Sequence, residues 1–334
     1  MTKQIPIVLI GASAGGSIVL EDLLEQFTER LDAAFFVVIH LSKKAIGEMI
    51  VHRIQKSTSL TCKIPKHKEK IKPNHIYFAP PDKHMLLKKE EILLDNGPLE
   101  NRYRPSIDAL FRSAAASHGN KTIGIVLSGM LEDGTAGMTD IKRVGGICIV
   151  QDPKEAEYPG MPMSIVKTVK PDYTIPIIEM GTVVESAIEK IRKVKPKNIP
   201  KQLLKEADIA ENVYVGINQV GPLGTHSLFS CPDCGGGLWE IKSGDNTHYR
   251  CHVGHSFSET GLLSAMEAST EAALWTALRI LEERKNLLNK LGEKEAKNGR
   301  RQLTVSFKKR AKELEVHIFT LKKLLFNTQV DMVN

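Results

Sequence analysis

Over residues 1–190, short apolar runs alternate with helical segments, and this alternation restricts the chain to a small number of folds. Residues 5–11, 34–40, 122–129 and 146–152 are nearly continuous runs rich in β-branched side chains, which is typical of strands buried on both faces. Strands that alternate with helices predict an α/β fold with a doubly wound, mostly parallel sheet. In such sheets, functional sites lie at the carboxyl ends of the strands.

The rest of the chain divides into three further parts. Residues 191–224 begin within a basic run, from Lys190 to Lys205, that contains no acidic side chain. We expect this part to be a solvated linker or a surface for an acidic partner. Residues 225–260 are rich in glycine, cysteine and histidine. Residues 261–330 carry apolar residues at spacings of three and four, which predict an amphipathic helical hairpin that could self-associate into a homo-oligomer.

Composition and charge exclude several classes of protein. The 334 residues are 42% hydrophobic and 25% charged, which excludes wholesale disorder. No apolar run is long enough to span a bilayer, and the amino-terminal residues do not have the pattern of a secretory signal. We therefore expect no membrane insertion and a cytoplasmic location. The net charge is +7, but the basic run contains no aromatic side chains, so nucleic acid is not an expected partner.

The sequence GASAG, residues 11–15, follows the first predicted strand and allows two interpretations. A dinucleotide-binding loop would need a glycine in place of Ser13 and an acidic residue in place of His40, at the end of the second strand. The pattern G-x-S-x-G instead matches a sharp turn that exposes a nucleophilic serine beside the start of a helix. We therefore favour Ser13 as a nucleophile over a nucleotide-binding loop.

Two further polar residues follow predicted strands and could complete a catalytic triad. His40 ends the second strand, and Asp133 lies shortly after the strand predicted over residues 122–129. If these strands are neighbours, all three side chains lie at one edge of the sheet. Ser13 would then attack the substrate, His40 would accept its proton, and Asp133 would fix the imidazole tautomer.

Six sequence blocks resemble, in order, the catalytic domain of the CheB-type chemotaxis protein-glutamate methylesterases. The resemblance extends from about residue 5 to residue 188. The blocks are IGASAGG, VIHLS, IYFAPPDKHMLL, YRPSIDALFRSAA, LSGMLEDGTAGM and QDPKEAEYPGMPMSIV. Because six blocks occur in the same order, the resemblance is far more specific than any single motif.

The resemblance implies a serine carboxylic-ester hydrolase with its triad on Ser13, His40 and Asp133 and no catalytic cofactor. It places an oxyanion contact on the backbone amide of Met130, and the residue after the serine, Ala14, lies beside the same cleft. The implied reaction is hydrolysis of glutamyl γ-methyl esters on cytoplasmic chemoreceptor helices, with release of methanol. Deamidation of receptor glutamines is a further implied activity.

Two departures from the family pattern support an alternative, a catalytically diverged scaffold that binds partners on the same fold. Ala14 stands where the family has threonine, and Leu131 with Glu132 stands where the pattern begins with glycine. The chain also opens directly on the first strand, so we expect regulation that does not depend on an attached receiver domain. His84 and Arg104 lie in shared blocks and are candidates either for the cleft or for structural hydrogen bonds.

A cysteine and histidine cluster predicts a metal site in residues 225–260. Cys231 and Cys234 form a C-x₂-C pair, and Cys251 and His255 follow after a spacer. This Cys₃His set has a spacing close to that of a zinc ribbon, with His252 as the alternative fourth ligand. Because four protein ligands leave no open position, the sequence predicts a structural zinc. Metal binding would supply much of the stability of so short a segment.

Overall fold

The computed structural model describes residues 4–27, 31–40, 47–211, 220–243 and 246–330. The chain separates into two compact units, Met1–Leu262 and Leu263–Asn334, and each unit is described by itself.

The first unit is built on a seven-stranded sheet in which every neighbouring pair is parallel. The strand order is β10-β9-β8-β1-β2-β5-β3. Every residue of the central strands β1, β2, β8 and β9 is buried, which explains why the sequence shows continuous apolar runs there. This confirms the predicted α/β fold with a mostly parallel sheet. The bounds are β1 Ile7–Ala12, β2 Ala34–Ile39, β3 Thr61–Lys63, β5 His75–Phe78, β8 Thr122–Val126, β9 Ile147–Gln151 and β10 Tyr173–Ile175.

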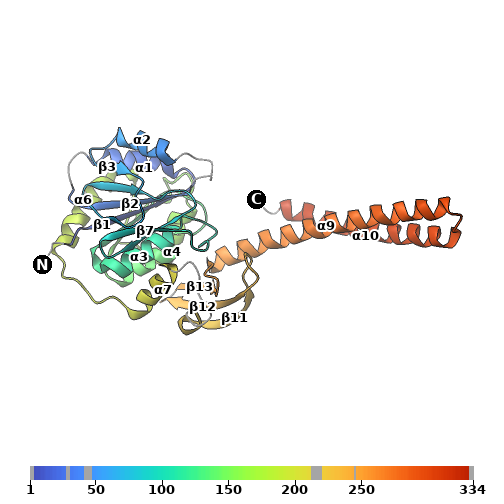
Figure 1. Cartoon of the computed structure of the whole chain (residues 1–334). Coiled ribbons are helices and arrows are strands. Elements are labelled where there is room, and N and C mark those ends of the chain that lie inside the picture. Colours follow the sequence, from blue (N-terminus) through green and yellow to red (C-terminus); the bar gives the residue numbers. More distant parts are fainter. Residues whose placement is uncertain (1–3, 28–30, 41–46, 212–219, 244–245, 331–334) are drawn as a thin grey trace. The chain divides into compact units, whose positions relative to one another are not determined.

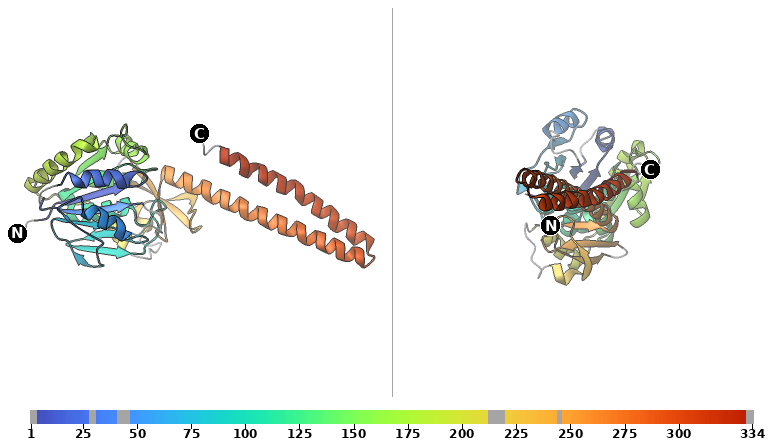
Figure 2. Two further views of the ribbon diagram at one scale, coloured as in Figure 1. Left: turned by 90° about the horizontal axis from the view of Figure 1, so that it is seen from above. Right: turned by 90° about the vertical axis from the view of Figure 1, so that its right-hand side faces the viewer.

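Helices cover both faces of this sheet (Figures 1 and 2). Successive side chains of β1 point to opposite faces: Val8 and Ile10 belong to one core cluster, and Ile7 and Leu9 to the other. The first cluster contains helices α1 (Gly16–Glu25), α2 (Gly47–Gln55) and α6 (Ile177–Lys193). The second contains α3 (Ile107–His118), α4 (Thr135–Arg143), α5 (Gly160–Thr168) and α7 (Lys201–Glu211).

Helix α7 lies where the sequence predicted a solvated linker, so the structure differs from that expectation. Leu203 and Ala207, four residues apart, are buried in the core beside α3. Lys201 and Lys205 remain exposed on the same helix. The basic run thus ends within a short amphipathic helix, and the lysines at the start of this helix make its sequence appear wholly hydrophilic. Part of the interval between α7 and the following sheet falls outside the described residues.

Two small antiparallel sheets complete the first unit. One has the order β4-β7-β6 and consists of β4 (Glu69–Lys70), β6 (His84–Lys88) and β7 (Glu91–Asp95). The other, called here the C-terminal sheet, has the order β11-β12-β13-β14 and contains the predicted cysteine and histidine cluster. Its strands are β11 (Thr225–Ser230), β12 (Gly237–Ser243), β13 (Asn246–Cys251) and β14 (Ser256–Ser258).

Helices α9 (Glu259–Lys297) and α10 (Arg301–Val330) form a hairpin and lie side by side (Figure 2), and the second unit contains α10 and the part of α9 from Leu263 onward. Their shared core contains Leu278 and Leu288 from α9 and Leu314 and Ile318 from α10. The predicted C-terminal helices are therefore present. No helix in the described part of the chain is both long and apolar enough to cross a membrane.

Candidate active site

Ser13 and His40 lie side by side at the carboxyl edge of the parallel sheet. In the register of β1 and β2, Ala12 pairs with Ile39, so each of the two functional side chains directly follows a paired residue. The His40 amide donates to the Ala12 carbonyl at 3.0 Å, and the Ser13 amide donates to the Ser128 carbonyl at 3.0 Å. Three strand ends therefore meet at Ser13.

The turn after Ser13 depends on glycine at two positions. Gly15 has a left-handed φ of 70° and caps α1, a conformation that glycine adopts without strain. A Cβ atom on Gly16 would lie 2.6 Å from the Cβ of Ala12, so no side chain fits there. The turn is closed by the Gly16 amide, which donates to the Ser13 carbonyl at 2.9 Å. Ser13 is consequently held beside the amino-terminal end of α1, where the helix dipole favours negative charge.

The His40 ring is fixed from two sides. Its Nε2 lies 2.9 Å from Asp133 Oδ2, and the side chains of His40 and Asp133 are 4% and 1% exposed. The Tyr103 ring stacks on the imidazole with centroids 3.7 Å apart and planes 5° from parallel. Nδ1 of His40 is buried and has no hydrogen-bond partner among the described residues. Because Asp133 occupies Nε2, Nδ1 is the nitrogen left to act as a base.

The carboxylate of Asp133 lies at the amino-terminal end of α3 and accepts several hydrogen bonds besides the one from His40. Ser106 Oγ and Asn101 Nδ2 each donate to Oδ1 at 3.0 Å. The Ile107 amide donates to Oδ2 at 2.7 Å and the Asp108 amide to Oδ1 at 3.2 Å. Burial opposes ionisation, but the donors, led by His40, hold the pKa of Asp133 below its ordinary value. The group is therefore a charged partner for the imidazole.

Asp108 carries the next carboxyl group in this hydrogen-bond network, and unlike Asp133 it tends to keep its proton. Burial, together with the negative charge of Asp133, raises the pKa of Asp108 well above its ordinary value. Asn101 Nδ2 donates to Asp108 Oδ2 at 2.7 Å and so lies between the two carboxyl groups. The asparagine separates two acids that would otherwise face each other directly.

The loop after β8 supplies backbone donors beside Ser13. A Cβ atom on Gly129 would lie 2.8 Å from the Cβ of Ser13, so the loop backbone approaches the serine closely. The Gly129 amide donates to the Tyr158 carbonyl at 2.9 Å, which fixes the loop. Among the described residues, no acceptor takes up the amides of Ala14 and Met130, and free amides beside a nucleophile are suited to an oxyanion.

Leu131 is one of the departures from the family pattern, and its backbone has an unusual conformation for a leucine. It has a φ of 64°, in the left-handed region, and its side chain is 43% exposed. That conformation suits glycine, the residue that begins the family pattern at this point. Leu131 therefore keeps a turn geometry that glycine would adopt more easily.

His84 and Arg104 make structural hydrogen bonds. His84 is buried, and its Nε2 lies 2.9 Å from the Pro98 carbonyl. Arg104 donates to Asp82 Oδ1 and to the backbone carbonyls of Asn96 and Gly97. These contacts favour the structural alternative for both residues.

The structure brings together the four side chains predicted as metal ligands. The ligand atoms of Cys231, Cys234, Cys251 and His255 all lie within 4.8 Å of one another. Sγ of Cys234 is 3.7 Å from Sγ of Cys251, and His255 Nδ1 is 3.5 Å from Sγ of Cys251. Tetrahedral zinc, with bonds to sulfur of about 2.3 Å, needs sulfur atoms about 3.8 Å apart. The four groups fit such an ion, and His252 is not part of the cluster.

Sequence reasoning missed three residues that contact the candidate triad, namely Asn101, Tyr103 and Ser106. Tyr103 and Ser106 belong to the block YRPSIDALFRSAA, and Ser106 precedes a helix as an N-cap residue should. These signals could have marked Ser106. Nothing local in the sequence marks Asn101.

Comparisons with known proteins cover the α/β part of the chain. The family model described as CheB methylesterase matches residues 8–184. A protein-glutamate methylesterase/protein-glutamine glutaminase of Thiobacillus denitrificans is 33% identical over 170 residues, which are 50% of this chain and 47% of that protein. A Leptospira interrogans protein that bears the same name provisionally is 34% identical over 169 residues, which are 50% of this chain and 87% of that protein.

A solved structure shows the same fold. The Thermotoga maritima CheB methylesterase catalytic domain aligns with a TM-score of 0.51 and 31% sequence identity. The alignment covers 56% of this chain and 99% of that domain. The similarity therefore includes nearly all of the solved domain and about half of the present chain.

Proposed function

This chain belongs to the CheB methylesterase family, and on that premise we propose that it hydrolyses glutamyl γ-methyl esters on chemoreceptor helices. The observation that carries the proposal is the buried pair of His40 and Asp133, 2.9 Å apart, beside the strand end that holds Ser13. The relatives are named protein-glutamate methylesterases, and a Ser-His-Asp set is suited to ester hydrolysis.

The residues act in two half-reactions. Ser13 Oγ attacks the ester carbonyl carbon while His40 Nδ1 accepts the hydroxyl proton, and the amides of Ala14 and Met130 stabilise the developing oxyanion. His40 then gives its proton to the departing methoxide, so methanol leaves and Ser13 carries the acyl group. Water attacks this acyl-enzyme with His40 again as the base, which frees Ser13 and leaves a glutamate carboxylate.

The same site can act on an amide. A receptor glutamine would form the same acyl-enzyme on Ser13, with ammonia as the leaving group in place of methanol, and the second half-reaction would be unchanged. The relatives are also named protein-glutamine glutaminases, which supports deamidation as a second activity of this site.

The hydroxyl of Ser13 makes no hydrogen bond to His40 within the described residues, which is common in free enzymes before substrate tightens the geometry. A serine-reactive fluorophosphonate tests whether the site is nevertheless reactive. We expect labelling at Ser13, found by peptide mass spectrometry, and loss of labelling in Ser13→Ala. Ser17→Ala, which removes a neighbouring hydroxyl in α1, should label like the wild type. Absence of labelling on Ser13 would favour the partner-binding scaffold.

We propose in addition that Cys231, Cys234, Cys251 and His255 hold a structural zinc ion. The mutual distances suit a tetrahedral ion, and Gly235 and Gly254, both with left-handed φ, form the tight turns between ligands. When bound, the ion would cross-link the end of β13 to the turn between β11 and β12 and to the turn between β13 and β14, which lie at the same end of the sheet. We expect about one zinc per chain in purified protein by elemental analysis, and near loss of zinc in Cys234→Ser. A protein free of zinc with intact thiols would contradict the proposal.

The partners we propose are the cytoplasmic helices of methylated chemoreceptors, which also implies a cytoplasmic location. Self-association through α9 and α10 is a further proposal, because Trp275, Phe319 and Phe326 are exposed on these helices. Light scattering on the full chain and on a chain ending at residue 262 tests it. We expect an oligomer only for the full chain. If both proteins have the mass of a monomer, self-association is contradicted.

A further inference from the structure

A tight turn over residues 99–103 lies between the candidate triad and the C-terminal sheet. Glu100 and Tyr103 hydrogen-bond to each other through both of their amides, at 3.2 and 3.0 Å. Asn101 and Arg102, the two residues between them, both have left-handed φ, 50° and 69°. This is a two-residue hairpin turn, so its side chains are held in fixed directions.

Two side chains of this turn contact the triad. Asn101 Nδ2 donates to Asp133 Oδ1 at 3.0 Å, and the Tyr103 ring stacks on His40. The turn therefore touches both the acid and the base of the proposed mechanism. Neither contact involves an atom that takes part in bond making.

The opposite side of the turn is joined to β14 of the C-terminal sheet. The Asn101 amide donates to the Ser256 carbonyl at 2.8 Å, and the Ser258 amide donates to Asn101 Oδ1 at 3.2 Å. Asn101 thus uses its Nδ2 group on Asp133 and Asp108, and its Oδ1 and backbone amide on the C-terminal sheet. One side chain connects the sheet to the catalytic carboxylate.

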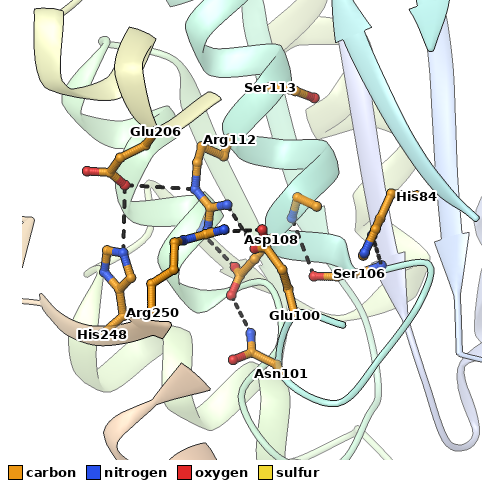
Figure 3. Close-up of polar contacts among 12 residues, drawn as sticks. His84, Glu100, Asn101, Ser106, Asp108, Arg112, Ser113, Glu206, His248 and Arg250 are labelled. Atoms are coloured by element: carbon orange, nitrogen blue, oxygen red, sulfur yellow. Dashed lines mark hydrogen bonds and ion pairs between the residues drawn. The ribbon is translucent and has the colours of Figure 1, made fainter. Parts of the chain in front are cut away.

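Buried charges hold the C-terminal sheet against this turn (Figure 3). Arg250 Nη2 donates to Glu100 Oε1 at 2.8 Å, and Arg112 Nη1 of α3 donates to Glu100 Oε2 at 2.8 Å. All three side chains are at most 5% exposed. Removing one charge from such a buried set leaves another uncompensated, so the sheet cannot leave the turn without a large cost.

Two residues that join the C-terminal sheet to this turn are next in sequence to proposed metal ligands. Arg250 precedes Cys251, and Ser256 follows His255. Arg250 Nη1 also donates to the Gly254 carbonyl, inside the ligand turn, at 3.1 Å, and the Cys251 amide donates to the His255 carbonyl at 3.0 Å. A metal ion that fixes the turn from Cys251 to His255 would therefore also fix the positions of Arg250 and Ser256.

We infer that the metal-bound C-terminal sheet braces the catalytic carboxylate, with Asn101 as the positioning residue that connects the sheet to Asp133. The inference rests on the proposed esterase function and on the proposed metal site. It gives the C-terminal sheet a role in catalysis without any contact between the metal and substrate.

A double-mutant cycle on the full-length protein tests the connection. Cys234→Ser weakens the metal site, and Asn101→Gly removes the connecting side chain from a left-handed position that glycine accepts. We expect each variant to lower kcat for methanol release by about 10–100-fold, the range typical of lost supporting contacts, with a smaller effect on KM. The double variant should have the kcat of Asn101→Gly alone. Effects that multiply would overturn the inference.

Matched controls separate this effect from general damage. Arg102→Gly places glycine at the neighbouring left-handed position while Asn101 keeps its contact to Asp133, and Cys62→Ser changes a buried thiol outside the cluster. Both should retain kcat within about twofold of the wild type, because Asn101 keeps its contacts to Asp133 and to β14 in each variant. An Arg102→Gly loss equal to that of Asn101→Gly would assign the effect to the turn backbone and overturn the role of Asn101.

Hydrogen exchange distinguishes failure of the brace from failure of the proposed function. Removal of metal by a chelator should speed exchange of peptides covering residues 99–108, including the Ile107 and Asp108 amides that bind Asp133, and leave β1 protected. If the wild type releases no methanol, the proposed function fails, and the exchange result still tests the brace. If methanol is released but chelation changes neither exchange nor kcat, the brace is overturned.

Discussion

Asp133 binds the imidazole of His40 at 2.9 Å in a place that excludes almost all solvent from both side chains. Its carboxylate also receives the first amides of α3, so the helix end and the imidazole compensate the same charge. A buried carboxylate with this many donors orients the histidine and is itself held in place by the main chain.

Replacing Asp133 by asparagine should therefore damage catalysis far more than folding. An amide oxygen can still accept from the α3 amides, but it carries no charge and does not enforce the productive tautomer of His40. We expect kcat to fall by about 10⁴-fold, as for the same change in other serine triads. Circular dichroism should be unchanged, and Glu132→Gln, at the preceding position, should keep activity. A loss below tenfold would contradict the role of Asp133.

Asp140 should make the stability of the protein depend on pH. Burial raises the pKa of Asp140 to about 7, against the lowering effect of Arg112, whereas the unfolded value is about 3.9. The folded carboxyl therefore keeps its proton between about pH 4 and 7 while the unfolded one loses it. The contribution of Asp140 to stability should fall as pH rises through this interval, by up to about 4 kcal/mol, and become constant above the folded pKa.

Urea unfolding of Asp140→Asn at several pH values measures this contribution. The variant should be more stable than the wild type near pH 7, with the difference shrinking toward pH 4. Asp22→Asn, which changes an exposed carboxyl of α1, should follow the wild-type curve. A wild-type stability that rises between pH 4 and 7 in parallel with Asp140→Asn would show that this carboxyl is ionised in the folded protein.

Leu131→Gly should stabilise the protein. The left-handed φ of 64° is unfavourable for leucine, and relief of that strain exceeds the entropy that glycine adds to the unfolded chain. We expect a gain of about 0.5–1 kcal/mol in the free energy of unfolding. Leu131→Ala keeps the unfavourable φ and should give no gain. If both variants destabilise the protein equally, the exposed leucine side chain contributes more than its backbone costs.

Arg250→Met should separate the C-terminal sheet from the turn that it braces. The change leaves Glu100 buried with Arg112 as its remaining close arginine, and loss of one member of a buried ion pair costs about 3–5 kcal/mol. Thermal and urea unfolding should both show this loss. The double change Glu100→Gln with Arg250→Met removes both members of the pair and should recover part of the stability. A single variant as stable as the wild type would show that the pair is not buried in solution.

Much of the fold and part of the site could be predicted because the responsible signals are local. Buried parallel strands read as continuous apolar runs, and Ser13, His40 and Asp133 each follow such a run. Because parallel strands end at a common edge of the sheet, the sequence pattern alone places these three residues together. The cysteine spacing likewise favours His255 over His252 as the fourth metal ligand.

The connection between the C-terminal sheet and the triad could not be predicted. Asn101 contacts Ser258, which is 157 residues away in sequence. The role of Asn101 also requires a left-handed turn that no sequence motif predicts. Glu100, Arg112 and Arg250 are charged, so patterning assigns them to the surface, whereas the structure buries them together. Because these charges compensate one another in the folded protein, the rule that charged residues lie at the surface fails for them.

Methanol release from a methylated chemoreceptor tests directly whether Ser13 is the nucleophile of an esterase. The rates of the wild type, Ser13→Ala and Ser17→Ala should be compared on the same receptor preparation. We predict release by the wild type and by Ser17→Ala, and none above background by a folded Ser13→Ala. Release that persists in Ser13→Ala at the wild-type rate would contradict the assignment of Ser13 as the nucleophile.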